Sequence, residues 1–185
     1  IKTDTGYKPV EWLREGDMIC TADNGLQPLV AALNTRFVAG ERTAPVCIQA
    51  GVLSNTRALR VSPNHRILIA DSLCELMFGT HEVFVLAKHL LGLPGVSAEA
   101  NAYEHITYYH LLLEQHEVIF ADHEPTESFF AGDMTELALG NTAGKMQAAI
   151  DGLAAPQEAA RTTLRSYEAQ ALLAALTAQK PQEAA

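Results

Sequence analysis

Cysteine is scarce in this chain, and no two cysteines stand close together. Cys20, Cys47 and Cys74 form no C-x-x-C pair. An odd number of cysteines at such wide spacing is typical neither of a disulfide framework nor of a zinc knuckle. We therefore expect each cysteine to behave as a small buried hydrophobic residue.

Basic residues and long apolar runs are also in short supply. Lys and Arg number 13 against 22 Asp and Glu, which gives a net charge of -9 at pH 7. This balance disfavours nucleic acids and anionic membrane surfaces as partners. No run approaches the roughly 18 apolar residues of a membrane span, and the first residues lack the basic-then-apolar pattern of a signal peptide. We expect no nucleic-acid and no membrane partner, and the sequence leaves the oligomeric state open.

The chain does have a succession of short strand-like segments, up to about residue 130. Its 185 residues are ample for one domain with a buried core. Segments rich in β-branched residues alternate with Gly, Asn, Asp and Pro. They cover residues 17–22, 26–39, 45–50, 58–62, 66–70, 82–87, 106–114 and 117–121. Asn24-Gly25 predicts a hairpin between the first two. The pattern indicates an all-β fold of many short strands.

The composition changes after the last of these strands, where Ala, Leu, Glu and Gln replace the β-branched residues. Small and apolar side chains recur at helical spacing at Ala160, Leu164, Tyr167, Ala171 and Ala174. Pro156 suits a first helical turn, so we predict a helix over residues 156–178. Its narrow stripe favours docking onto the rest of the protein. The chain is thus expected to divide into a β domain, residues 1–133, and an alanine-rich helical tail, residues 134–185.

Four of the seven histidines fall in one stretch, at His105, His110, His116 and His123. Residues on paired strands can converge from any sequence distance, so a shared site is conceivable. Their spacings differ from those of helical metal ligands, however, and no Cys or carboxylate stands at zinc-like spacing. We therefore predict no metal site, and surface or core roles are the simpler interpretation of each histidine taken alone.

The sequence "SPNH", Ser62 to His65, carries the most specific chemical signal. Pro63 and Asn64 favour a turn, so Ser62 and His65 can face the same space. Histidine exchanges a proton near neutral pH, and a hydroxyl can stabilise an oxyanion. The alternative is a serine that caps its own turn and a histidine bound to a backbone carbonyl. A third interpretation is a β-rich hydrolase with an external substrate, but the chain lacks a G-x-S-x-G elbow and an evident acidic partner.

Several segments, taken in order, resemble one family. The opening "IKTDTGYKPVEWLREGDMICTADNGLQPL" resembles the start of a Hint domain, the module shared by inteins and hedgehog proteins, with a T-x-x-G turn and a V-x-x-L-x-x-G-D motif. "VSPNHRILI" falls where that family keeps T-x-x-H, with Ser62 in place of threonine and His65 as the histidine. "YYHLLLEQHEVIFADHEPTESF", followed by "GD", resembles the later segment of bacterial Hint domains. The resemblance covers residues 1–133.

This resemblance implies a flat, two-lobed, all-β horseshoe that processes its own chain without metal, nucleotide or other cofactor. A Cys or Ser at the start of the domain attacks the carbonyl before it, and hydrolysis or transfer resolves the resulting thioester or ester. By position, His65 gives a proton to the departing amide nitrogen and Ser62 helps to hold the oxyanion. His116 matches a later histidine that assists the second step. His110 stands where many members carry an aspartate, after Tyr109.

Two departures from the family pattern limit this expectation. The nucleophile is expected about seven residues before Ile1, so the polypeptide upstream of Ile1 is the expected substrate. The chain also lacks a His-Asn end followed by Cys, Ser or Thr, so protein splicing is not expected. The alternative is a Hint fold with a degenerate site that serves as a binding or structural module. Similar bacterial domains often belong to large exported proteins, but no residue of this chain indicates secretion.

Overall fold

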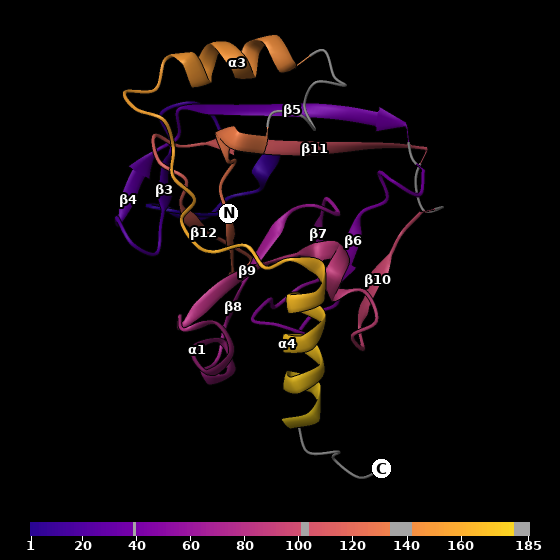
Figure 1. Cartoon of the computed structure of the whole chain (residues 1–185). Helices are drawn as coiled ribbons and strands as arrows, with labels where there is room; N and C mark the ends of the chain where they lie inside the picture. The colour runs from indigo at the N-terminus through magenta and orange to yellow at the C-terminus, as the bar shows by residue number, and fades with distance from the viewer. Residues whose placement is uncertain (39, 101–103, 134–141, 180–185) are drawn as a thin grey trace.

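The computed structural model of the chain describes residues 1–38, 40–100, 104–133 and 142–179, and short antiparallel strands dominate them (Figure 1). The strands are β1 (Lys2–Thr3), β2 (Gly6–Tyr7), β3 (Met18–Cys20), β4 (Leu26–Pro28), β5 (Ala31–Val38), β6 (Val46–Ile48), β7 (Leu59–Val61), β8 (Arg66–Ala70), β9 (Glu82–Leu86), β10 (Val96–Ala98), β11 (His105–Leu112), β12 (Val118–Ala121) and β13 (Glu124–Glu127). Helical segments are η1 (Val10–Trp12), α1 (Ser72–Phe78), η2 (Ala87–Leu90), η3 (Ala131–Asp133), α3 (Ala143–Asp151) and α4 (Ser166–Gln179). The predicted all-β class is confirmed.

The strands form small sheets, and the β12–β13 hairpin connects two of them. Their orders are β2-β1-β3-β4, β10-β6-β7 and β12-β13-β8-β9, and β5 pairs with β11 in a separate ribbon (Figure 1). Thr21 forms a bridge to Ile119 of β12, and Thr126 of β13 pairs with Ile67 of β8. The hairpin therefore connects the amino-terminal sheet to the sheet that follows the Ser62–His65 turn.

Strands β8 and β9 form the buried centre of this arrangement. Half of their side chains are β-branched or aromatic, which suits a pleated, buried surface. Ile67, Val83, Phe84 and Val85 are fully buried. Each such side chain contributes about 1.5–3 kcal/mol when it is removed from water. The turn that carries His65 is thus anchored at the start of a deeply buried strand pair.

The single strand predicted over residues 26–39 is wrong, because the chain changes sheets within it. Strand β4 ends at Pro28. Leu29 then donates to the carbonyl of Asp17 at 2.9 Å, while Val30 donates to the carbonyl of Leu112 at 2.8 Å. Strand β5 starts at Ala31 on β11. Two successive backbone partners in different sheets break one apolar run into two strands.

The helix predicted over residues 156–178 also begins later, at Ser166. Before it, Thr162 accepts a hydrogen bond from Phe84 N at 2.8 Å and Leu164 donates to Phe84 O at 2.9 Å. These two bonds hold residues 162–164 in an extended conformation beside β9. The segment that follows Pro156 is therefore not helical until Ser166. The stripe is also out of phase: Tyr167 is 64% exposed, whereas Ala169, Leu172 and Leu173 are buried.

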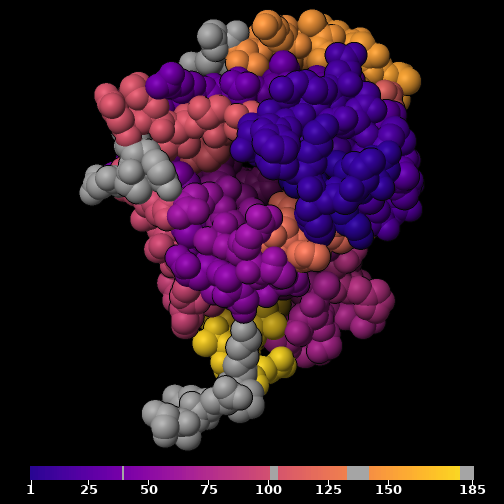
Figure 2. All heavy atoms as spheres, turned by 180° about the vertical axis from the view of Figure 1, so that it is seen from behind, coloured from indigo at the N-terminus to yellow at the C-terminus, as the bar shows by residue number. Residues whose placement is uncertain are grey.

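The two larger helices lie at opposite ends of the molecule. Helix α3 lies over the β5–β11 ribbon, and α4 packs its buried residues against the core around β8 and β9 (Figure 1). The view from behind shows the same separation, with the amino-terminal segments in indigo near α3 and α4 in yellow at the far end (Figure 2). The expected docking of the carboxyl-terminal helix is thus present. None of the described helices is long and apolar enough to cross a membrane.

Candidate active site

Backbone hydrogen bonds hold the Ser62–His65 turn in place. His65 N donates to Ser62 O at 3.1 Å, which closes the turn predicted from Pro63 and Asn64. On its other side, Ala87 N donates to His65 O and Lys88 N donates to Pro63 O, both at 2.8 Å. Ala87 and Lys88 belong to η2, which follows directly from β9, and β8 begins right after His65. The buried β8–β9 pair therefore holds the turn from both sides.

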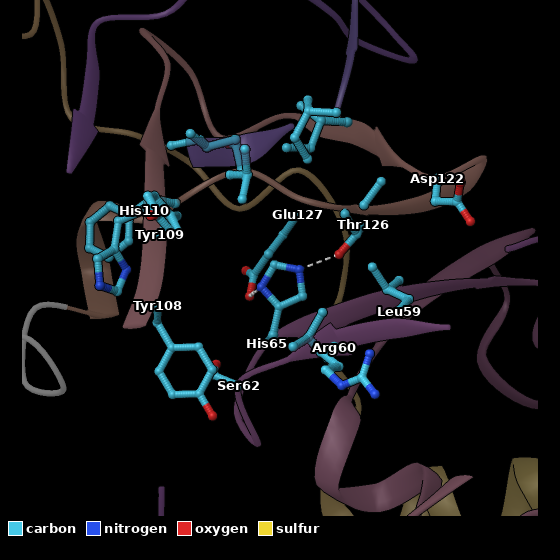
Figure 3. A pocket seen from close by; sticks show the side chains of 18 of the residues that line it. Leu59, Arg60, Ser62, His65, Tyr108, Tyr109, His110, Asp122, Thr126 and Glu127 are labelled. Atoms are coloured by element: carbon cyan, nitrogen blue, oxygen red, sulfur yellow. Dashed lines mark hydrogen bonds and ion pairs between the residues drawn. The ribbon is translucent and has the colours of Figure 1, made fainter. Parts of the chain in front are cut away.

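Ser62 and His65 both line a cavity of about 800 Å³ (Figure 3). His110 of β11 lines it as well, from another sheet. Further lining residues come from the chain start and from β7, β11 and the β12–β13 hairpin: Ile1, Tyr7, Leu59, Arg60, Tyr108, Tyr109, Asp122, Thr126 and Glu127. The structure thus brings three of the four predicted site residues to one space, together with Ile1.

The hydrogen bonds of the Thr126 hydroxyl determine which ring nitrogen of neutral His65 carries the proton. The Thr126 hydroxyl donates its single proton to Arg66 O at 2.8 Å, and its oxygen is also in close contact with His65 Nε2 (Figure 3). The hydroxyl oxygen must therefore accept from His65, and Nε2 carries the proton. In the neutral ring Nδ1 keeps its lone pair and lies 3.8 Å from Glu127 Oε1. His65 is thus ready to take up a proton at Nδ1.

Glu127 stands behind His65 as a buried, ionised carboxylate. Its Oε1 accepts from Arg66 N and its Oε2 from Arg66 Nη1, each at 2.7 Å. Burial alone would raise the pKa of Glu127, but His116, His65 and Arg66 together lower it below its usual range. A negative charge therefore faces Nδ1 of His65 and stabilises the imidazolium that protonation creates there.

Burial dominates the pKa of His65 and lowers it from its ordinary value. Glu127 opposes this shift, and the charge of Arg66 adds to it. His65 is therefore neutral at physiological pH. A neutral imidazole with a free nitrogen is the form that a general base requires.

His116 does not line the cavity but lies behind Glu127, and only 1% of its side chain is exposed. Its Nδ1 accepts a hydrogen bond from Ala160 N at 3.1 Å, so Nε2 carries the proton of the neutral ring. Nε2 lies 3.3 Å from Glu127 Oε2, outside the geometry of a hydrogen bond. His116 is therefore a neighbour of Glu127 rather than of the cavity, and its predicted part in a second proton transfer stays a prediction.

His110 faces the cavity from the opposite wall. Its Nε2 lies 3.2 Å from the hydroxyl of Thr35, and its ring meets the ring of Phe129 edge-on. Burial, together with the nearby His65, lowers the pKa of His110 to about 4. At neutral pH it is an uncharged hydrogen-bonding group, unlike the aspartate that its position implies in the family.

The match to a family model gives this arrangement its context. The model of the Hint domain matches residues 1–133, which is more than half of the chain. This chain belongs to the Hint domain family. Comparison with curated proteins and with solved structures found no match.

Three residues of this Hint domain site escaped the sequence analysis as site residues: Thr126, Glu127 and Arg66. The first two belong to β13, whose sequence "EPTE" is polar and contains proline, so it gives no strand signal. Yet Glu124, Thr126 and Glu127 are all buried. Buried carboxylates need partners, and the "ESF" similarity to bacterial Hint domains, residues 127–129, was the signal that could have drawn attention to Glu127.

The described His, Cys, Asp and Glu side chains lack the arrangement that a metal ion requires. No group of three or more His, Cys, Asp or Glu residues in the described part of the chain is arranged to hold a metal ion. His105 is exposed on β11, whereas His123 occupies the β12–β13 turn, where its ring centroid lies 4.6 Å from that of Tyr7 with the two rings tilted. The four neighbouring histidines therefore occupy different environments.

Glu124, at the start of β13, gives this Hint domain a pH-dependent stability. It is 2% exposed and accepts a hydrogen bond from Ser54 N at 2.7 Å. Burial raises its pKa to about 7, despite that hydrogen bond. Folded Glu124 therefore binds a proton more tightly than the unfolded chain does, and stability falls as the pH rises toward and through 7.

The E124Q variant removes this penalty. We expect its free energy of unfolding in urea to exceed that of the parent by about 1–3 kcal/mol at pH 8, with little difference at pH 5. The exposed Glu41, changed to glutamine, serves as the control and should show no pH-dependent difference. An equal gain at both pH values would mean that ionisation of Glu124 is not the cause.

Proposed function

We propose that this Hint domain cleaves the peptide bond at its own amino-terminal junction by an intramolecular acyl shift, without protein splicing. The carrying observation is the neutral His65, which lines a cavity that Ile1 also lines and whose unprotonated Nδ1 lies 3.8 Å from the buried carboxylate of Glu127. The substrate is the polypeptide that precedes Ile1. A segment of about seven residues spans up to about 25 Å when extended, enough to bring a nucleophile into this cavity.

The reaction begins with a Cys or Ser in that preceding segment. Its thiol or hydroxyl gives its proton to His65 Nδ1, and Glu127 stabilises the imidazolium. The sulfur or oxygen attacks the carbonyl carbon just before it, and Ser62 donates a hydrogen bond to the oxyanion. His65 then returns the proton to the amide nitrogen. The C–N bond breaks, and a thioester or ester remains in its place with a free amine.

Water or another small nucleophile completes the cleavage by attacking this thioester or ester. The carbonyl carbon gains the new oxygen, and the thiol or hydroxyl leaves with a proton. Protonation of the amide nitrogen is the costly part, because an amine is a poor leaving group. The His65–Glu127 pair supplies the proton and stabilises the charge at that stage.

The test is expression of the chain with its natural upstream sequence, followed by intact mass spectrometry with and without dithiothreitol. We expect scission just ahead of an upstream Cys or Ser, and acceleration by the thiol when a thioester forms. A precursor that stays intact in both conditions would overturn the proposal. The domain would then be a Hint scaffold that binds rather than cleaves.

A further inference from the structure

The segment between α3 and α4 lies beyond the residues that match the Hint family, yet it contacts the proposed site. We call residues 154–165 the linking segment. It leaves α3 at one end of the molecule, runs past the β12–β13 hairpin and β9, and reaches α4 at the other end (Figure 1). Within it, Gln157 accepts from Ala131 N at 2.9 Å and donates to Leu113 O at 2.8 Å. The linking segment is therefore fixed to the strands around His116.

Ala160 supplies the first contact with the site. Its backbone N–H donates to Nδ1 of His116, a ring that is buried between Phe84 and Phe130 at centroid distances of 5.7 and 4.8 Å. A proton on Nδ1 would face this N–H, so the contact keeps the proton on Nε2. The protonated Nε2 then lies 3.3 Å from Glu127 Oε2. The contact thus selects one tautomer of His116.

Thr163 supplies the second contact, on the other side of Glu127. Its hydroxyl oxygen accepts from Arg66 Nε at 2.9 Å, while Nη1 of the same guanidinium donates to Glu127. The bridge between Thr163 and Phe84 holds the segment parallel to β9 at this point. The Arg66 guanidinium is therefore held at two of its nitrogens, and this fixes its orientation toward Oε2 of Glu127.

We propose that Ala160 and Thr163 are positioning residues of the Hint site, which orient His116 and Arg66 so that Glu127 faces His65. This inference rests on the proposed function for its effect on cleavage. It also makes a separate claim about the state of His116 that holds whether or not the precursor cleaves. The site then extends beyond the residues that match the family, into the alanine-rich region.

Two substitutions test the two contacts, each beside a matched control. A160P removes the N–H that His116 accepts, and A159P places proline at the neighbouring exposed position. T163V removes the acceptor of Arg66 Nε, and T162V changes an exposed side chain while leaving the carbonyl that pairs with Phe84. Circular dichroism checks that each variant is folded. Because T163V is nearly isosteric, it stays informative if A160P fails to fold.

The first measurement is the ¹⁵N imidazole spectrum of the full chain, which distinguishes the two tautomers of His116. We expect the Nε2–H form in the parent and in A159P, and a mixture of the two tautomers in A160P. The second is the cleavage rate of the precursor, which should fall about 10- to 100-fold in A160P and T163V, and stay near the parent value in both controls.

The outcomes separate this inference from the proposed function. If the parent cleaves and both A160P and T163V cleave at the parent rate, the positioning role is overturned while self-cleavage stands. If the parent does not cleave, the spectrum decides: an unchanged His116 tautomer in folded A160P overturns the inference, and a changed one supports it. Loss of cleavage in T162V as well as T163V would assign the effect to the local backbone and overturn the role of the Thr163 hydroxyl.

Discussion

Replacement of His65 by alanine is expected to lower the rate of precursor cleavage by about 10²- to 10⁴-fold, the range that a positioned general acid-base residue contributes. The substitution removes the nitrogen that takes the nucleophile's proton and returns it to the amide. It leaves Glu127 with its two hydrogen bonds from Arg66. The measurement is the rate constant for scission, from intact mass over time at pH 7.

The matched control for this substitution is His105→Ala, which removes an exposed histidine from β11. We expect its cleavage rate to equal that of the parent. His65→Ala also removes the contact with Thr126, so its folded state needs confirmation by circular dichroism. A folded His65→Ala precursor that cleaves at the parent rate would remove His65 from the mechanism, even if the domain proved to be self-cleaving.

The lowered pKa of His65 adds an expectation on pH. The reaction starts with neutral His65, and burial keeps the ring neutral below the pH at which a free histidine becomes charged. The rate should therefore persist as the pH falls through 6.5 and decline only at lower pH. This behaviour distinguishes His65 from an exposed histidine that acts at its ordinary pKa.

The β-strands of this domain could be predicted from the sequence where a continuous apolar segment pairs within a single sheet. The β-branched run of β8 and the apolar run of β9 pair with each other, and both were predicted within a residue of their ends. Helix α1 was missed because it is short, although its two ends carry local signals. Asp71 caps its start by accepting from Leu73 N, and Gly79 ends it with a positive φ of 72°.

The cavity residues were predictable only in part, and the reason is the same for each omission. The Ser62–His65 turn is local, so the sequence defines it, and the order of motifs placed His110 and His116 near it. The proton positions are not local. They depend on Thr126 and Glu127 from β13 and on Ala160 from the linking segment, which are brought together by pairing and packing. No spacing rule describes contacts between residues so far apart in the chain.

The largest effect on stability is expected from Glu127→Ala. Glu127 is the acceptor for Arg66 N and for its guanidinium, and it lies 3.3 Å from buried His116. Alanine leaves these donors in the protein interior without their anion. Removal of one partner from a buried ion pair costs about 3–5 kcal/mol. Because a domain of this size has a total stability of about 5–15 kcal/mol, the loss would be a large part of it.

Urea denaturation at pH 7 measures this loss, and Glu127→Gln separates charge from shape. Glutamine keeps an acceptor for Arg66 N but removes the negative charge, so we expect an intermediate loss. The control is the exposed Glu41→Ala, which should stay within about 0.5 kcal/mol of the parent. Because the pKa of Glu127 is lowered in the folded state, the difference between the parent and Glu127→Ala should shrink as the pH falls through that pKa. A loss no greater than that of the control would show that Arg66 and His116 find other partners, and that Glu127 is not the charge that organises the site.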